Sequence, residues 1–206
     1  MFLKRVLVGA LQTNCYLAGA DDGRECVVID PGADADKIVN AAMAAGRKIT
    51  AILLTHGHFD HIGAVSDLKN RLEVKVYACE KEQELLASPM LNLSSGFYGD
   101  ISEKADCAVK ESDIITEAGL SLKVIETPGH TIGGICLYEE AEGVLFSGDT
   151  LFEMSVGRTD FPTSSAASLV ASIRNKLYVL PDETVVYPGH GGETGIGFEK
   201  KNNMYV

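Results

Sequence analysis

The feature that most constrains this chain is the heptapeptide at residues 55–61, Thr-His-Gly-His-Phe-Asp-His. Imidazole nitrogens and carboxylate oxygens suit zinc, iron or manganese at neutral pH. The glycine between the first two histidines lets the backbone turn tightly, so that both rings can reach one point. A nearly continuous apolar run at residues 49–54 precedes the motif and is typical of a strand buried on both faces. The sequence therefore predicts a covered sheet that ends at a metal site. The candidate ligands in this motif are His56, His58, Asp60 and His61.

The remaining two of the five histidines share one local setting. His130 stands in Thr-Pro-Gly-His-Thr at residues 127–131, and His190 stands in Tyr-Pro-Gly-His-Gly at residues 187–191. Each follows an apolar run that is typical of a strand. Asp149 closes a further apolar run, in Ser-Gly-Asp. Because clustered histidine and aspartate are the usual signature of a metal site, we expect these loops to face one centre.

Seven candidate ligands are more than one zinc ion holds, since zinc takes about four. They are enough for two metals that share a bridging carboxylate. Two metals about 3.5–4 Å apart can hold one water or hydroxide between them and lower its pKa toward about 7. The predicted chemistry is hydrolysis of an activated acyl or ester bond, without a nucleophilic serine or cysteine. A structural zinc site is disfavoured because such sites are rich in cysteine, and no cysteine here has ligand spacing.

Composition narrows the class of protein. A chain of 206 residues with 46% hydrophobic and 23% charged residues is expected to form a single domain over residues 1–206. The net charge of −11 argues against nucleic acid or an anionic membrane as a partner. No apolar stretch approaches the roughly 20 residues of a membrane span, and the first eight residues are too short for a signal peptide. The five cysteines form no C-x-x-C pair, so we predict buried thiols and a cytoplasmic location.

Apolar periodicity and turn residues predict two groups of strands with intervening helices. One predicted helix begins near Asp60 and carries Ile62, Val65, Leu68 and Leu72 on its core face. The pattern fits two sheets packed face to face with helices outside. The predicted strands are 2–9, 14–19, 25–30, 49–54, 74–78, 113–127, 133–139, 143–147 and 183–187, and the helices are 34–45, 80–87 and 164–178, besides the helix from Asp60.

Two features have alternative interpretations. Asp30, at the end of the third predicted strand, can hydrogen-bond to a ligand histidine from outside the metal shell, or it can cap its own loop. Residues 88–112 are irregular and rich in turn residues. They form either a cover over the site, through Phe97 and Tyr98, or a plain surface loop.

The order of the motifs resembles the metallo-β-lactamase-fold hydrolases. This superfamily carries T-H-x-H-x-D-H, P-G-H-T, S-G-D and P-G-H in the same order, which here spans residues 55–190. Leu151-Phe152 followed by Gly-Arg-Thr-Asp at residues 157–160 resembles the glyoxalase II-like branch, the hydroxyacylglutathione hydrolases. The chain ends sixteen residues after His190, at residue 206, so it resembles the short bacterial form without the helical domain that binds glutathione.

The resemblance implies a fold, a metal centre and an activity. The fold would be a four-layer αββα sandwich of the α/β (α+β) class. Two divalent metals would be bound, zinc by preference, with iron or manganese as alternatives. A metal-bridging hydroxide would attack the carbonyl of a small-molecule thioester such as S-lactoylglutathione, with Asp60 and Asp149 as catalytic residues. The resemblance assigns the first metal to His56, His58 and His130, the second to Asp60, His61 and His190, and the bridge to Asp149.

Substrate contacts cannot be transferred from the long form. Arg158, Lys200 and Lys201 are candidates for contact with an anionic substrate, or they are solvated or loop-stabilising charges.

Other activities share this fold. A persulfide dioxygenase with a single iron would use His56, His130 and Asp149, and that branch also carries Gly-Arg-Thr-Asp. A lactonase or a phosphodiesterase is compatible with the same ligands. A β-lactamase is disfavoured because no export signal is present and no cysteine stands in the ligand set. A metal-binding protein without enzymatic activity is disfavoured because its complete set of metal ligands would have no use.

Overall fold

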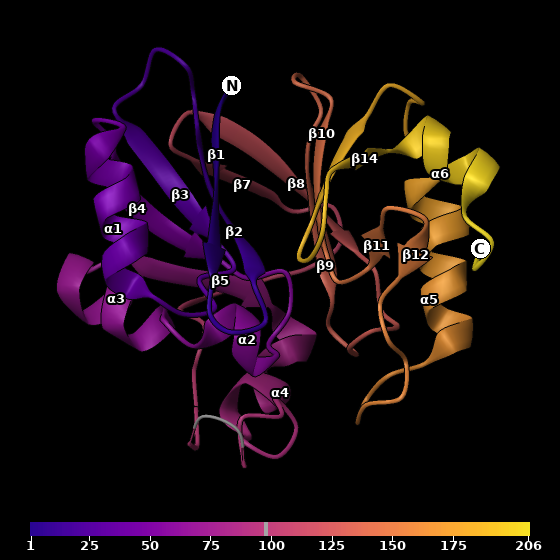
Figure 1. The fold of residues 1–206 in the computed structure, drawn as a ribbon, viewed down its shortest axis with the longest axis horizontal. Coiled ribbons are helices and arrows are strands. Elements are labelled where there is room, and N and C mark those ends of the chain that lie inside the picture. The colour runs from indigo at the N-terminus through magenta and orange to yellow at the C-terminus, as the bar shows by residue number, and fades with distance from the viewer. Residues whose placement is uncertain (97–98) are drawn as a thin grey trace.

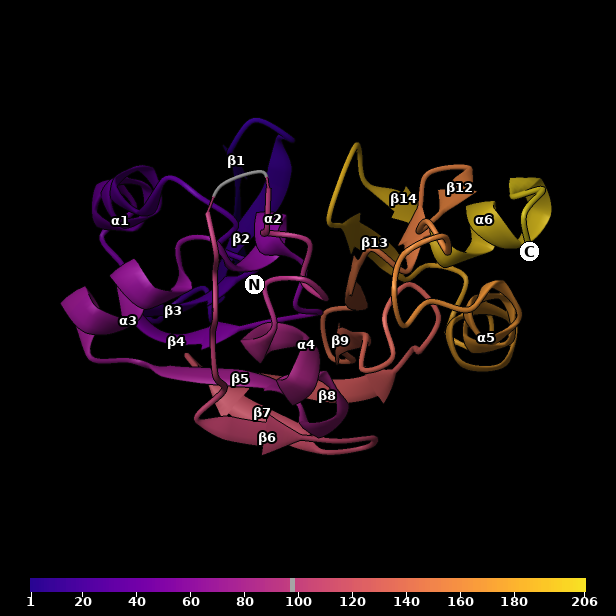
Figure 2. The same cartoon turned by 90° about the horizontal axis from the view of Figure 1, so that it is seen from below.

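The computed structural model describes residues 1–96 and 99–206, so the predicted cover by Phe97 and Tyr98 lies outside the described residues. Two six-stranded sheets face each other, and helices cover their outer faces (Figures 1 and 2). The first sheet has the order β1 (Phe2–Val8), β2 (Thr13–Gly19), β3 (Glu25–Ile29), β4 (Lys48–Leu53), β5 (Lys75–Cys79) and β6 (Cys107–Val109). The second has the order β14 (Thr194–Gly195), β13 (Val185–Pro188), β10 (Val144–Gly148), β9 (Ile135–Glu139), β8 (Leu120–Glu126) and β7 (Ile114–Glu117).

Strand direction places several loops at one edge of the sandwich. In the first sheet β3, β4, β5 and β6 run parallel, and in the second β10 runs parallel to β13. Parallel neighbours need crossover connections, and helices on the outer faces supply them. On the first sheet these are α1 (Ala35–Ala44) and α3 (Val65–Leu72), and on the second α5 (Ala166–Ser172) with α6 (Ile196–Asn202) beside it (Figure 2).

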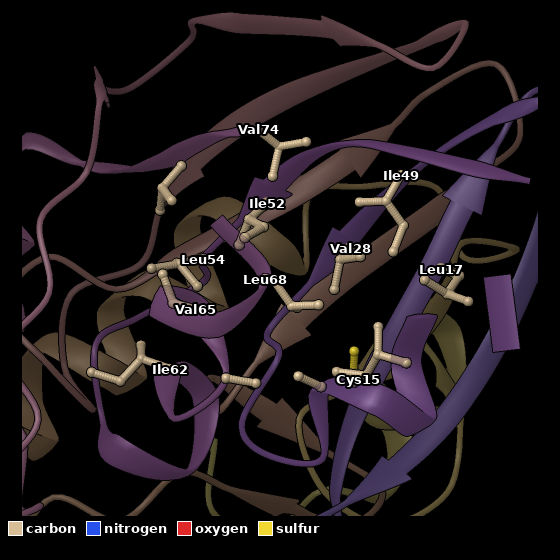
Figure 3. Close-up of a cluster of buried hydrophobic side chains, with 14 of the residues drawn as sticks. Cys15, Leu17, Val28, Ile49, Ile52, Leu54, Ile62, Val65, Leu68 and Val74 are labelled. Carbon is tan, nitrogen blue, oxygen red and sulfur yellow. The ribbon is translucent and has the colours of Figure 1, made fainter. Parts of the chain in front are cut away.

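Three hydrophobic layers hold the sandwich together. One lies between the first sheet and its helices, where Val28 and Ile52 pack against Leu68 (Figure 3). A second lies between the two sheets and includes Phe146. The third lies between the second sheet and α5, and includes Leu169. Strands buried on both faces explain the continuous apolar runs of the sequence. The predicted four-layer αββα sandwich is confirmed.

The helix predicted from Asp60 is interrupted. Helix α2 spans Phe59–Ile62, and α3 begins only at Val65. The break arises because the N–H of Ala64 donates to the carbonyl oxygen of Pro31 (2.9 Å). A hydrogen bond to a distant loop thus replaces one within the helix, and periodicity alone does not reveal it.

Three further elements differ from the prediction. The strand expected over 113–127 is a hairpin of β7 and β8, which turns at Ala118 and Gly119, both with positive φ. The helix expected over 164–178 is α5 followed by a π-helical turn at Ile173–Leu177. The short helix predicted at 80–87 is a 3-10 turn (Glu80–Glu82) followed by α4 (Gln83–Ala87).

A small two-stranded sheet pairs β11 (Leu151–Phe152) with β12 (Ser155–Val156).

The thiols agree with the prediction. All five cysteines are free, four of them buried and Cys107 partly exposed. Among the residues that the structure describes, no helix is both long and apolar enough to cross a bilayer.

Candidate metal centre

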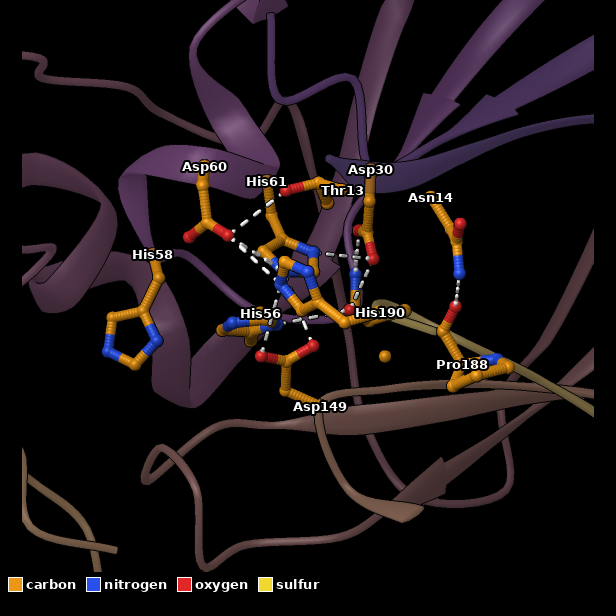
Figure 4. Close-up of polar contacts among 12 residues, drawn as sticks. Thr13, Asn14, Asp30, His56, His58, Asp60, His61, Asp149, Pro188 and His190 are labelled. Carbon is orange, nitrogen blue, oxygen red and sulfur yellow. Dashed lines mark hydrogen bonds and ion pairs between the residues drawn. The ribbon is translucent and has the colours of Figure 1, made fainter. Parts of the chain in front are cut away.

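Four strand ends deliver the seven predicted ligands to one place (Figure 4). Residues 56–61 follow β4, His130 follows β8, Asp149 follows β10 and His190 follows β13. The strands come from both sheets, so the ligands meet only because the two sheets face each other. This convergence is the geometry that a metal centre requires.

The first group is a triplet of buried imidazoles. The candidate ligand atoms of His56, His58 and His130 lie within 4.8 Å of one another. Nδ1 of His58 is 2.9 Å from Nε2 of His130. Burial, together with the neighbouring His130, lowers the pKa of His58 to about 3. Burial and the neighbouring histidines also hold the pKa of His56 well below its ordinary value. Both rings are therefore neutral at pH 7, the form in which imidazole binds a metal.

The second group combines one carboxylate with two imidazoles. Asp60, His61 and His190 also lie within 4.8 Å of one another, and Oδ2 of Asp60 is 3.1 Å from Nε2 of His190. Burial opposes the charged form of His61, but the carboxylates of Asp60 and Asp149 outweigh it and raise its pKa well above the ordinary value. The negative charge of these two carboxylates favours a bound cation, either a proton or a metal ion.

Asp149 lies between the two triplets. Its Oδ2 is 3.6 Å from Nε2 of His130, and its Oδ1 is 3.4 Å from Nε2 of His61. Burial disfavours the ionised carboxyl, yet the neighbouring histidines, His61 foremost, lower its pKa. Asp149 is therefore ionised at neutral pH and has one oxygen near each triplet. Figure 4 shows it facing the imidazoles from the side opposite Asp60.

Unsatisfied polar atoms test whether a metal fits. Nε2 of His56, Nε2 of His61 and Oδ1 of Asp149 are buried and have no hydrogen-bond partner. Such atoms cost free energy unless something else pairs with them. A divalent cation bound by nitrogen and carboxylate oxygen satisfies all three. The cluster therefore fits divalent metals.

Hydrogen bonds outside the cluster orient the rings. Oδ2 of Asp30 lies 3.0 Å from Nδ1 of His61, so the opposite nitrogen of that ring faces the cluster. Oδ1 of Asp30 accepts from the backbone N–H of Thr55 (2.8 Å) and Oδ2 from its hydroxyl (2.6 Å), so this carboxylate holds the start of the histidine motif besides the ring of His61. In the same way the carbonyl oxygen of Arg158 lies 2.8 Å from Nδ1 of His130. Such partners fix the tautomer and direction of a ligand histidine.

Sequence reasoning missed two residues that support the site. The hydroxyl of Thr13 donates to Oδ2 of Asp60 (3.1 Å), and the amide of Asn14 donates to the carbonyl oxygens of Pro188 (2.9 Å) and Gly191 (3.0 Å). Both side chains are buried polar groups at the start of β2. The signal available in the sequence was a Thr-Asn pair entering an apolar strand.

Gly57 serves a different purpose from the predicted tight turn. Its φ lies outside the left-handed region, so a side chain would be allowed by the backbone. A Cβ at this position would, however, lie 2.8 Å from Cδ2 of Leu85 and 3.0 Å from Cδ2 of Leu86. Glycine is needed because the motif passes close to α4.

The predicted substrate cations have partners of their own. The guanidinium of Arg158 binds the carboxylate of Asp160 through two hydrogen bonds (2.7 and 3.0 Å) and lies over the ring of Phe161. Phe161 is 5.4 Å from the ring of His58, which places Arg158 near the rim of the cluster. Lys200 lies on α6, where its ammonium binds Asp182, and the structure does not bring it to the cluster. Lys201 lies on the same helix and is exposed.

A pocket adjoins the cluster at Asp60 and Thr13. Its volume is about 260 Å3, and its walls are largely apolar and include Val8, Leu11, Phe59 and Ile101. A substrate bound at the cluster thus has apolar surface available beside Asp60.

Comparison with known proteins identifies the class that the sandwich and its His/Asp cluster define. The chain belongs to the metallo-beta-lactamase superfamily, because its residues 8–190 match the model of that family. It is a hydrolase-like enzyme of this superfamily, and the resemblance seen in the motifs is confirmed at that level.

Three relatives show the range of activities nearby. Hydroxyacylglutathione hydrolase GloC of Haemophilus influenzae is 33% identical over 100% of this chain and 98% of its own length. The crystal structure of BLEG-1 B3 metallo-beta-lactamase is 40% identical with a TM-score of 0.93, covering 99% of each chain. TTHA1623 in a di-iron-bound form is 35% identical with a TM-score of 0.87, covering 98% of this chain and 100% of its own.

A fourth relative is also known from its solved structure. ETHE1 from Myxococcus xanthus is 30% identical with a TM-score of 0.82, covering 99% of this chain and 84% of its own.

Proposed function

We propose that this protein is a metal-dependent thioesterase of the hydroxyacylglutathione hydrolase type. The observation that carries the proposal is the position of Asp149 between two complete ligand triplets, which favours two metals over one. The whole-length similarity to GloC and the Gly-Arg-Thr-Asp sequence at residues 157–160 support this branch. The free cysteines agree with work in the cytoplasm, where thiols stay reduced.

The residues divide into holding and orienting roles. His56, His58 and His130 would hold one metal, and Asp60, His61 and His190 the other, with Asp149 shared. When bound, two such metals lower the pKa of water and polarise a carbonyl oxygen.

The chain itself supplies orientation. Asp60 is ionised because its neighbours, His61 foremost, lower its pKa against the effect of burial. Its Oδ2 already accepts from Thr13, so the carboxylate is held in one direction and can orient a water toward a thioester carbonyl carbon. Attack breaks the carbon–sulfur bond, and the products are a carboxylic acid and a thiol. The apolar pocket beside Asp60 offers a place for the uncharged part of the substrate.

The test is hydrolysis of S-lactoylglutathione by protein loaded with zinc, iron or manganese in turn, with metal content measured for each sample. We expect about two metals per chain and thioester cleavage. Asp149→Asn should lower kcat/KM by at least about 100-fold. Loss of a residue that only hydrogen-bonds to a metal ligand costs about 10–100-fold, and loss of a ligand shared by both metals should cost more. Lys200→Ala, remote from the cluster, should leave kcat/KM unchanged. Fully metallated protein that cleaves no thioester would contradict the proposal.

A second candidate function is β-lactam hydrolysis. It is favoured by the 40% identity and whole-length overlap with BLEG-1 B3 metallo-beta-lactamase. A chromogenic cephalosporin assayed beside the thioester separates the two functions. A kcat/KM higher for the cephalosporin than for the thioester would favour this candidate.

The persulfide dioxygenase alternative finds support in the similarity to ETHE1. It would use only His56, His130 and Asp149, and the other four residues of the cluster would have no role: His58, Asp60, His61 and His190. One iron per chain, together with oxygen consumption in the presence of glutathione persulfide, would favour it. Lactones and phosphodiesters complete the substrate panel.

A further inference from the structure

Glu82 is a buried carboxylate outside the ligand cluster. Its side chain is fully buried, at the last residue of the 3-10 turn between β5 and α4. Oε1 accepts a hydrogen bond from the N–H of Gly57 (3.0 Å), and Oε2 accepts one from the N–H of Gly133 (2.7 Å). Each oxygen therefore binds a different loop.

These two loops carry the first ligand triplet. Gly57 separates His56 from His58, and Gly133 lies three residues after His130. One loop follows a strand of the first sheet and the other follows a strand of the second. The N–H of Ile135, the first residue of β9 after the His130 loop, donates to the carbonyl oxygen of Thr55 (2.9 Å), the first residue of the motif. Glu82 joins them again on the far side of His56, so the two links bracket this ligand.

The chemistry of the link explains why a carboxylate is present. A buried charge is costly unless hydrogen bonds to it are well formed. Here the N–H groups of Gly57 and Gly133 donate to different oxygens, and glutamate supplies both acceptors, whereas glutamine would replace one of them by an NH2 group that cannot accept. Space is limited as well, because a Cβ at Gly133 would lie 2.5 Å from Oε2 of Glu82.

We propose that Glu82 is a positioning residue that sets the spacing between the His56–His58 loop and the His130 loop, and thereby the metal affinity of the first triplet. The inference rests on the metal-binding part of the proposed function and is independent of the substrate. Nothing in the second triplet contacts Glu82, so the effect is specific to one of the two metals.

The experiment uses Glu82→Gln and Glu82→Ala, with Glu199→Gln as the matched control. Glu199 is also fully buried, on α6, where it accepts from the N–H of Met154 (3.1 Å), the hydroxyl of Thr194 (2.6 Å) and the amide of Asn203 (2.8 Å). It contacts neither the His56–His58 loop nor the His130 loop, so it reports what loss of a buried carboxylate does without a change in the spacing of these two loops. Zinc affinity is measured by competition with a chromogenic chelator, together with zinc per chain, the absorption spectrum of the cobalt-substituted protein and Tm.

We expect Glu82→Gln to lower the zinc affinity of one site by about 10–100-fold and to leave the affinity of the other site unchanged. Glu82→Ala should lower the affinity of the same site further. The cobalt spectrum should change for the Glu82 variants. Glu199→Gln should lower Tm while both affinities stay at the wild-type value.

Two results would overturn the inference: Glu82 variants that bind both zincs with wild-type affinity, or affinity losses that Glu199→Gln reproduces in proportion to its loss of Tm. Should Glu82→Ala fail to fold, Glu82→Gln decides, because it retains the volume of the side chain. Failure of the thioesterase proposal is recognised separately, as wild-type protein that binds two zincs without cleaving thioesters.

Discussion

At the scale of single residues, the cluster depends on polar groups outside it that orient its histidine rings. Asp30 and the carbonyl of Arg158 each hold the outer nitrogen of a ligand histidine, at 3.0 and 2.8 Å. A ring held in this way presents its other nitrogen without losing rotational freedom on binding. Asp30 also has a positive φ of 52°, a conformation that aspartate and asparagine tolerate better than most residues.

Asp30→Asn therefore keeps the backbone conformation and the side-chain volume but replaces one carboxylate oxygen by an amide NH2. The Asp30 oxygens now face the N–H and hydroxyl of Thr55 and Nδ1 of His61, so the NH2 would face a group that also donates. We expect metal affinity at His61 to fall by about 10–100-fold, with a matching fall in kcat/KM. Metal content after dialysis and steady-state kinetics check this. Asp34→Asn is the control, because Asp34 also has positive φ but its carboxylate accepts from Gly9 near the surface. Equal losses in both variants would point to general destabilisation.

At the scale of elements, helix α5 supports the loop that carries His130. The hydroxyl of Ser165 accepts from the N–H of Ser168 (3.2 Å) and so caps the helix. The N–H of Ser165 donates to the carbonyl of Gly129 (2.8 Å), and the hydroxyl of Ser172 donates to the carbonyl of Pro128 (2.8 Å). The Pro-Gly-His loop is thus hydrogen-bonded to both the start and the end of this helix.

Ser165→Ala should destabilise the protein by about 1 kcal/mol, because it removes the N-cap acceptor. The backbone bond to Gly129 survives the substitution, so metal affinity should stay unchanged. Urea denaturation measures the first quantity and chelator competition the second. Ser168→Ala, in the first turn of the same helix, should change stability by less than about 0.5 kcal/mol, because its contribution to the cap is a backbone N–H. A larger effect at Ser168 than at Ser165 would contradict the capping role.

At the scale of the whole molecule, each hydrophobic layer contains a buried thiol. Cys26 lies beneath α1, Cys79 between the sheets and Cys136 beneath α5. Burial raises the pKa of each to about 11. Since the neutral thiol is favoured in the fold, the unfolded chain releases these protons at lower pH than the folded protein does.

The predicted consequence is a loss of stability in alkali. From about pH 9, the ordinary value for cysteine, the unfolded state is progressively favoured until the folded thiols ionise at about 11. Tm should therefore fall as the pH rises from 9 to 11. Thermal melts across this range measure the slope for the wild type and for Cys136→Ala, whose slope should be shallower because one titrating group is gone. Identical slopes would show that this thiol does not contribute.

The sequence by itself determined the layers and the candidate ligands, because both depend on local sequence patterns. Runs such as residues 49–54 identify buried strands, and the histidines are marked by the glycines and prolines around them. The resemblance of the motif order to that of the superfamily then assigned the candidate ligands to two metals.

Only the tertiary structure decided which groups act on those ligands from outside. Glu82 meets Gly133 across 51 residues, and Asp30 meets His61 across 31, with no periodic signal to relate them. The same holds for the helix that ends at Ile62, where a distant carbonyl takes the N–H of Ala64, and for Lys200, which α6 carries to Asp182. Hydrogen bonds between distant loops depend on how the two sheets pack, and packing is a property of the folded chain as a whole.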